Sequence, residues 1–207
     1  MNEPLTAGDF SEWLRAMRQA LAGRTGMAVA CGDCVGCCTS SYFIKVRPHE
    51  TAALQHIPAA HREPAPGKPG TWLMGYDQKG HCHMFGAGGC SIYSNRPETC
   101  RTYDCRIFAA AGMSAGETRP VINERVARWR FEYSEAGRLE HQAVTAAASF
   151  LRQHPVRFPG GQIPSRPGDI AVLAVKSYTV FLSPPASDAD AAAGIVDACR
   201  AFDQAST

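Results

Sequence analysis

Apolar and polar residues follow a helical period near the start of the chain. From residue 11 to about residue 21 the apolar positions fall on one helical face, and Asp9 or Ser11 can serve as the polar N-cap. The apolar positions of this face are Trp13, Leu14, Met17 and Leu21. The pattern predicts a helix that packs its apolar face against the rest of the protein.

The next part of the chain has short periodic segments between irregular ones. Residues 31–40 consist largely of glycine and cysteine and predict no regular element. Every second residue from Tyr42 to Val46 is apolar, which predicts a strand over residues 41–46. Pro48 suits the first position of a helix, which we expect to run to about His56.

A proline-rich stretch at residues 57–70 predicts a loop between two groups of cysteines. After it, residues 71–76 and 81–85 flank a polar turn at residues 77–80. This arrangement predicts a β-hairpin that carries Cys82. The glycines that follow allow the backbone to bend sharply before Cys90.

From Pro120 onward the pattern becomes helical again. Apolar residues predict two amphipathic helices between residues 120 and 151, and two more at about 168–182 and 187–203. Prolines and glycines between residues 159 and 167 predict a linker before the last pair.

These elements predict an α+β fold that is rich in helix. We expect a small cysteine-rich metal-binding centre with a β-hairpin, wrapped by N- and C-terminal helices. The expected organisation is a cysteine-cluster domain at residues 1–160, with its motif core at 31–110, and a helical extension at 161–207 packed on the same domain.

Composition and charge narrow the choice of partners. The 207 residues have a formal net charge of +2, far from the basic excess of most nucleic-acid binders. Neither an export signal nor a run of about 18 apolar residues is visible, so we expect a cytoplasmic protein without nucleic-acid or membrane partners. Nine cysteines are many for such a protein, because a reducing compartment disfavours disulfides. Metal ligation is the favoured explanation.

The cysteines have the spacing of metal ligands. The run CGDCVGCC places two residues between successive thiols, which allows the chain to turn back on one metal. Together with the downstream cysteines it supplies eight candidate ligands, enough for two four-ligand sites or for one cluster and a separate ion. The candidates are Cys31, Cys34, Cys37, Cys38, Cys82, Cys90, Cys100 and Cys105.

Adjacent side chains seldom share one small tetrahedral ion, so Cys37 and Cys38 are expected to have different roles. Cys31, Cys34 and Cys37 have the spacing of the first three ligands in a bacterial ferredoxin run. The fourth ligand of that run, with its proline, does not follow. The run therefore favours either an iron–sulfur cluster whose fourth ligand is a distant cysteine or a zinc site.

Both halves of this pattern resemble the YkgJ-type cysteine cluster proteins, a family with the signature CxxCxxCC. The matching residues are the CGDCVGCC run, Cys82, the segment CSIY at residues 90–93 and the segment RPETCRTY at residues 96–103. The resemblance covers about residues 31–110 and implies chelation of zinc or iron. Flagellin lysine methylases have a similar cysteine pattern, which implies an iron–sulfur enzyme acting on a protein or peptide as the alternative.

Several other residues could contribute to a metal site. Arg96 could favour nearby thiolates or could simply bind a loop carbonyl group. His81 and His83 flank Cys82, but in a strand they would point away from it. We expect Cys199 to be an inert, buried thiol and Asp104, like Glu98, to be solvated.

Three hypotheses follow for the function. The first is a non-catalytic module that binds zinc or iron, and the second is the iron–sulfur enzyme. The third is a zinc-organised adaptor that contacts a protein partner through the helices of residues 120–203. The sequence shows no paired catalytic carboxylates, phosphate-binding glycine loop or serine hydrolase elbow, which favours the non-catalytic module.

Overall fold

A computed structural model of the chain describes residues 3–29, 31–87 and 89–206. Two compact units make up the structure. Unit 1 comprises Met1–Thr25, Asp104–Glu117 and Asn123–Thr207, and unit 2 comprises Gly26–Tyr103 and Thr118–Ile122. Helices take up 51% of the chain and strands 12%, which confirms the predicted α-rich α+β class.

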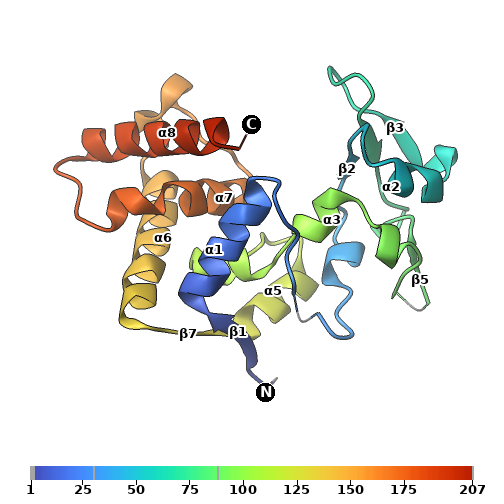
Figure 1. Cartoon of the computed structure of the whole chain (residues 1–207), viewed down its shortest axis with the longest axis horizontal. Helices are drawn as coiled ribbons and strands as arrows, with labels where there is room; N and C mark the ends of the chain where they lie inside the picture. Colours follow the sequence, from blue (N-terminus) through green and yellow to red (C-terminus); the bar gives the residue numbers. More distant parts are fainter. Residues whose placement is uncertain (1–2, 30, 88, 207) are drawn as a thin grey trace. The chain divides into compact units, whose positions relative to one another are not determined.

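Unit 1 is mainly helical (Figure 1). Helices α1, α6, α7 and α8 lie side by side, and the parallel strands β1 and β7 pair at one end. The elements of this unit are β1 (Leu5–Asp9), α1 (Phe10–Leu21), α4 (Arg106–Ala110), α5 (Pro120–Arg128, which begins in unit 2), β7 (Trp129–Glu132), α6 (Glu135–Gln153), α7 (Pro167–Ser177) and α8 (Asp188–Gln204).

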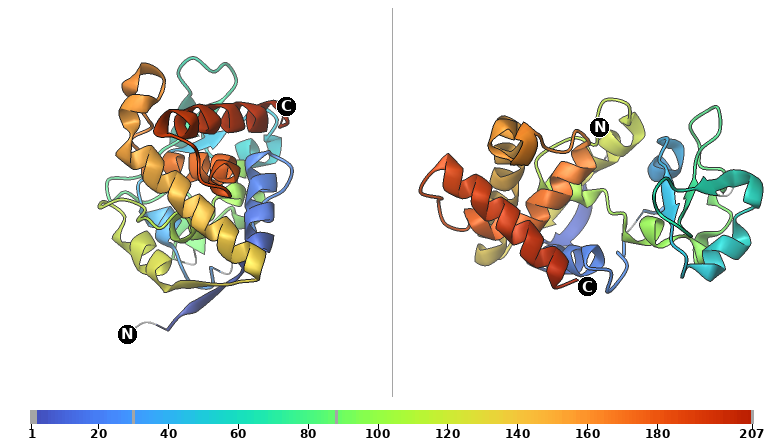
Figure 2. Two further views of the ribbon diagram at one scale, coloured as in Figure 1. Left: turned by 90° about the vertical axis from the view of Figure 1, so that its left-hand side faces the viewer. Right: turned by 90° about the horizontal axis from the view of Figure 1, so that it is seen from above.

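Polar caps start three of these helices. The Asp9 side chain accepts a hydrogen bond from the Glu12 amide, as expected for an N-cap residue, and Ser134 and Ser187 cap α6 and α8 in the same way. The ribbons of α6, α7 and α8 lie close to one another in the two views of Figure 2. Small buried side chains allow this close packing. These are Ala143, Ala147 and Ala148 of α6, Ala171 and Ala174 of α7, and Ala191 and Ala192 of α8.

A buried ion pair lies in the core of unit 1. Asp104, with 2% of its surface exposed, pairs with Arg106 at 2.7 Å and accepts a hydrogen bond from the indole N–H of Trp13 at 2.9 Å. Arg106 also donates to the Ala7 carbonyl oxygen, so the pair links α4 to α1 and β1. The expectation that Asp104 is solvated is therefore wrong, because the neighbouring Arg106 and the Trp13 indole, which is distant in sequence, replace its water.

Unit 2 is built on a three-stranded antiparallel sheet with the order β2-β4-β3. Alternate residues of these strands pack with the helix α2 into a small apolar cluster formed by Ile44, Val46, Ala53, Ile57, Met74, Met84 and Ile92. The elements are β2 (Ile44–Val46), α2 (Thr51–His56), β3 (Arg62–Pro64), β4 (Trp72–Met74), β5 (Phe85–Gly86), β6 (Gly89–Cys90) and α3 (Glu98–Thr102), with 3-10 turns at Gly36–Thr39, Ala59–His61 and Tyr93–Asn95.

The sequence prediction for unit 2 needs three corrections. Helix α2 begins at Thr51 instead of Pro48, and the expected loop at residues 57–70 contains β3, which pairs with β4. The predicted hairpin is reduced to a turn closed by a single bridge between Tyr76 and Cys82, because β4 pairs with β2 and β3 instead. Partner strands distant in sequence decided these pairings. The strands β1 and β7 of unit 1 were likewise not predicted.

The predicted division into residues 1–160 and 161–207 stays a prediction. The two compact units of the structure are divided differently, because each consists of segments that are not continuous in sequence. The two helical pairs predicted after Pro120 are present as α5 to α8. Among the described residues, no helix has the length and apolar character needed to cross a membrane.

Replacing Asp104 by alanine should lower the free energy of unfolding by about 3 kcal/mol, because Arg106 would remain buried without its counter-charge. Chemical denaturation followed by far-ultraviolet circular dichroism measures this change. Asp197→Ala is the matched control: its pair with Arg200 is exposed (73% and 64% of the two side chains), so its loss should cost less than about 1 kcal/mol. Equal losses in the two variants would contradict the assigned role of the buried pair.

Candidate metal centre

The structure places seven of the eight candidate cysteines in unit 2 and Cys105 in unit 1. Cys31 and Cys34 precede the 3-10 turn at Gly36–Thr39, and this turn carries Cys37 and Cys38. Downstream, Cys82 follows the polar turn, Cys90 ends β6 and Cys100 lies in the middle of α3. All nine cysteines of the chain lie among the described residues, and none of their thiols forms a disulfide bond.

The two halves of the cysteine motif are joined through the backbone. The Cys82 N–H donates a hydrogen bond to the Cys38 carbonyl oxygen at 2.8 Å. A hydrogen bond from the Cys34 N–H to the Cys31 carbonyl oxygen closes the turn after Cys31. A second one, from the Cys38 N–H to the Val35 carbonyl oxygen, closes the turn that follows. These bonds hold the loop in a compact form and place it against the downstream segment.

A polar turn positions Cys82. Asp77 accepts hydrogen bonds from the backbone N–H groups of Lys79 and His81, which fixes the turn. Gly80 has a φ of 78°, and a Cβ there would collide with the Ser41 hydroxyl, so only glycine fits. The Gly80 carbonyl in turn accepts a hydrogen bond from the Ser41 N–H, which again joins the downstream segment to the first half of the motif.

The short hairpin of β5 and β6 brings Cys90 back beside Cys82. The Phe85 N–H donates to the Cys82 carbonyl oxygen, and Phe85 pairs with Cys90 across the two strands. Both cysteines pack against the apolar cluster of unit 2, as does Cys100. The apolar cluster thus supports three thiols at the same end of the unit.

Helix α3, which carries Cys100, is anchored by the buried carboxylate of Glu50. Glu50 has 7% of its surface exposed and accepts hydrogen bonds from the N–H groups of Arg47 and Glu98, the latter being the first residue of α3. Thr99 donates from its hydroxyl to the Lys45 carbonyl at 2.7 Å. Sequence reasoning missed Glu50, because its partner Glu98 lies 48 residues away.

The adjacent thiols Cys37 and Cys38 differ in their ionisation. A hydrogen bond from the Cys38 thiol lowers the pKa of Cys37 to about 7, and the positive charge of Arg96 acts in the same direction. The same hydrogen bond, together with burial, raises the pKa of Cys38. Cys37 is therefore favoured as the thiolate of the pair and Cys38 as the proton donor, and different roles for the two at a metal stay a prediction.

Burial and mutual repulsion keep the neighbouring thiols protonated in the absence of metal. Burial raises the pKa of Cys82, and it raises that of Cys100 to about 12. The charges of Cys37, Cys82 and Cys90 also act on Cys100, and those of Cys82 and Cys90 act on Cys38. Such effects require proximity, so the five thiols form one group, which we call the thiol cluster: Cys37, Cys38, Cys82, Cys90 and Cys100.

Arg96 has both of the roles that its sequence context suggests. Its Nη1 donates to the Tyr93 carbonyl oxygen at 3.1 Å, and its guanidinium lies over the Tyr93 ring at 3.9 Å from the centroid. Held in this way, it lowers the pKa of Cys37 and of Cys100. A single cation thus acts on two members of the thiol cluster.

The remaining candidates have other surroundings. Cys105 lies before α4 in unit 1, where the Trp129 indole N–H donates to its sulfur at 3.3 Å. His83 stacks on His61, and His81 packs edge-on against Phe85. Burial raises the pKa of Cys199, whose thiol is within 3.9 Å of the Leu173 carbonyl oxygen, as expected for an inert structural thiol.

The donor chemistry of the thiol cluster fits zinc or iron. Thiolates are the preferred ligands of both zinc and iron–sulfur clusters, and four of them suffice for either. Within residues 3–29, 31–87 and 89–206, no three histidine, cysteine, aspartate or glutamate side chains are already set as ligands of one ion. The protonated thiols would have to lose their protons and draw together around a metal.

In metal-free, reduced protein, iodoacetamide should alkylate Cys37 faster than Cys38, Cys100 or Cys199, with half of the maximal rate near pH 7. Peptide mass spectrometry after short reaction times measures the rate at each site. Arg96→Gln should move the midpoint for Cys37 to higher pH, because a cation that favours the thiolate is removed. Equal rates at Cys37 and Cys38 would contradict the assigned hydrogen bond.

Comparison with known proteins provides one match. Residues 30–125 match the model of the CxxCxxCC family, described as a "putative zinc- or iron-chelating domain". No curated protein and no solved structure matches the chain. The match contains the CGDCVGCC run, the thiol cluster and Arg96. The family matched over residues 30–125 is the one that the cysteine pattern resembles.

Proposed function

We propose that the chain binds zinc or iron through the thiol cluster of unit 2. The observation that carries this proposal is the grouping of five thiols from segments far apart in sequence, each close enough to affect the ionisation of others. A metal ion offsets their mutual repulsion, because it binds the deprotonated form.

Charge balance assigns a role to Arg96 in this site. Four thiolates around a divalent ion leave a net charge of about −2, which a nearby cation stabilises. Arg96 already favours the ionised forms of Cys37 and Cys100 before any metal binds. Its contact with Tyr93 keeps the guanidinium near the cluster.

Metal affinity should depend on pH. Cys82 and Cys100 have raised pKa values in the metal-free protein, so binding must displace protons from them. The apparent affinity for the metal should therefore increase as the pH rises, and this increase should continue above pH 7.

The remaining three candidates, Cys31, Cys34 and Cys105, stay predicted ligands. Cys34 lies close to Gly36, where an added Cβ would come within 3.6 Å of the Cys34 sulfur. Cys31 and Cys34 belong to the same loop as Cys37, so a second ion or a larger cluster could engage them. Single serine variants separate these alternatives.

A storage, delivery or sensing module fits this site more directly than an enzyme, because the residues grouped in it are thiols and one arginine that affects their ionisation. Protein purified without oxygen distinguishes zinc from an iron–sulfur cluster. A colourless protein containing zinc indicates a single-ion site, and a brown protein containing iron and sulfide indicates a cluster. The second result would favour the enzyme related to flagellin lysine methylases.

Freshly purified protein should contain bound metal, and serine at Cys82, Cys90 or Cys100 should lower the metal content to less than about half, because one ligand of a four-ligand site is lost. Elemental analysis of each variant measures the content. Cys199→Ser is the matched control and should leave it unchanged. Metal-free wild-type protein that is fully folded, or equal loss in Cys199→Ser, would contradict the proposal.

Removing the metal should loosen unit 2 while the helices of unit 1 persist. The apolar cluster of unit 2 is small and its strands have two or three residues, so burial offsets little of the chain entropy. Structural zinc can contribute roughly 10 kcal/mol in small domains, comparable with the stability of a whole fold.

Hydrogen exchange with and without a chelator measures this difference. Amide protection should fall across residues 31–103 and change little in α6, α7 and α8. Unchanged protection of unit 2, in a sample shown by elemental analysis to have lost its metal, would mean that the metal does not hold this unit.

A further inference from the structure

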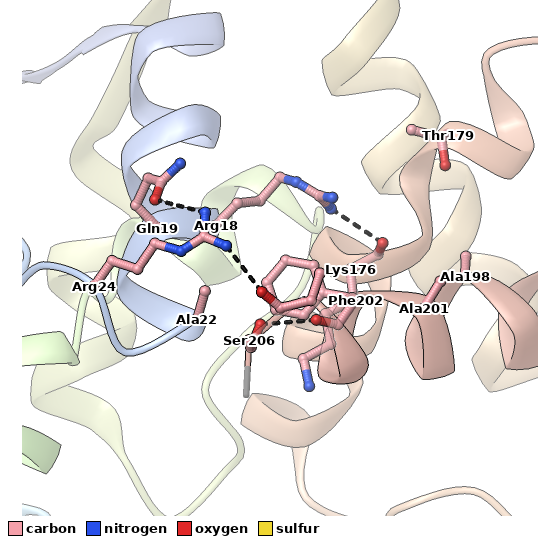
Figure 3. A pocket seen from close by; sticks show the side chains of 11 residues that line it. Arg18, Gln19, Ala22, Arg24, Lys176, Thr179, Ala198, Ala201, Phe202 and Ser206 are labelled. Atoms are coloured by element: carbon pink, nitrogen blue, oxygen red, sulfur yellow. Dashed lines mark hydrogen bonds between the residues drawn. The ribbon is translucent and has the colours of Figure 1, made fainter.

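Unit 1 contains a cavity of about 420 Å³ at the C-terminal ends of α1, α7 and α8. This volume is within the range of small-molecule sites. Three cations line the cavity: Arg18 from α1, Arg24 from the loop after it and Lys176 from α7. Figure 3 shows Arg18 and Arg24 reaching from the α1 side toward the ends of α7 and α8, with the Lys176 amino group on the other side of the Phe202 ring.

Uncharged partners hold the two arginines in place. Arg18 Nη1 donates to the carbonyl oxygens of Val175 and Lys176, and its guanidinium lies over the Phe202 ring at 4.8 Å. Arg24 donates to the Gln19 side chain at 3.2 Å and to the Ala205 carbonyl at 2.9 Å (Figure 3). These contacts orient the guanidinium groups, and the carbonyl groups at the helix ends offset only part of their charge.

Lys176 has a carboxylate partner. Its Nζ is 2.6 Å from Asp203 Oδ1, and its side chain is 16% exposed. The lining therefore has three full positive charges against this one carboxylate and the partial negative charge of three helix C-termini, each about half a unit. Positive charge is in excess at the cavity.

The rest of the lining is small and apolar. Ala22, Ala198 and Ala201 leave room between the helices, and Phe202 offers an aromatic ring next to the cations. The hydrogen bonds of Arg18 use only Nη1 among the described residues, so Nε and Nη2 keep donors for a further acceptor. A ligand with an anionic group next to an apolar group could therefore contact the cations and the Phe202 ring together.

We propose that this cavity binds a small phosphate ester, with its phosphate between Arg18 and Arg24 and its organic group against Phe202. A phosphate carries close to two negative charges and several acceptor oxygens, which match two guanidinium groups better than one carboxylate does. The site lies in unit 1, whereas the thiol cluster lies in unit 2. No bond is formed or broken in this binding.

The competing interpretation is that the arginines only bind the carbonyl groups at helix ends. Cations at helix C-termini are stabilising by themselves. Under that interpretation the removal of Arg24 would lower stability with or without phosphate, and no saturable binding would occur. Binding measurements separate the two interpretations.

Isothermal titration of the metal-loaded full chain with phenyl phosphate tests the proposal, with inorganic phosphate as the second probe and chloride used to match ionic strength. Saturable binding is expected for both, and tighter for phenyl phosphate because its ring can contact Phe202. Arg24→Gln should weaken binding at least about tenfold, since a charge-assisted hydrogen bond is lost. Arg18→Gln should also weaken it and provides a second variant should the first one fail to fold.

Arg200→Gln is the matched control, because it removes one positive charge from α8 outside the cavity lining. It should leave both affinities unchanged. Phe202→Leu should reduce the preference for phenyl phosphate over inorganic phosphate. No saturable binding, an equal loss in Arg24→Gln and Arg200→Gln, or binding that disappears with the metal but not with Arg24 would overturn the proposal.

Discussion

The hydrogen bond from the Cys82 N–H to the Cys38 carbonyl oxygen is the contact on which the arrangement of the thiols depends. It joins the segment that ends the CGDCVGCC run to the segment that carries Cys82, and these two lie on either side of the proline-rich stretch in the sequence. On one side the 3-10 turn presents Cys37 and Cys38, and on the other the β5–β6 hairpin returns Cys90 beside Cys82. Glu50 then anchors α3 and adds Cys100. The apolar cluster of unit 2 supports this end of the unit but is small.

Five thiols in one region impose an electrostatic constraint, because they cannot all ionise together. The structure accommodates this by sharing protons unequally: Cys37 is favoured as thiolate, while Cys38, Cys82 and Cys100 keep their protons. Arg96 supplies positive charge from a position fixed by Tyr93. A divalent ion would add more positive charge at shorter range. The same constraint explains why metal binding should release protons and why it should complete the fold of unit 2.

Unit 1 depends on different physics. Its helices have polar caps, alanine-rich contacts and a buried pair between Asp104 and Arg106, so its stability comes from packing and from satisfied polar groups. Where three of its helices end, unsatisfied carbonyl groups attract arginines, and these bring positive charge to the rim of a cavity. The proposed phosphate site follows from this local excess of charge. This proposed site is separate from the thiol cluster, which lies in unit 2.

The sequence alone determined the features that depend on short-range patterns. The amphipathic helices α1 and α5 to α8 follow from apolar spacing and polar caps, and the CGDCVGCC run with its downstream cysteines predicted metal ligands and the family that residues 30–125 match. The tertiary structure decided what depends on distant partners. It grouped five cysteines in unit 2, placed Cys105 in unit 1 beside Trp129, buried Asp104 beside Trp13 and paired β4 with β2. The physical reason is that strand pairing, burial of a charge and the proximity of thiols are set by contacts between residues tens of positions apart, which no local periodicity encodes.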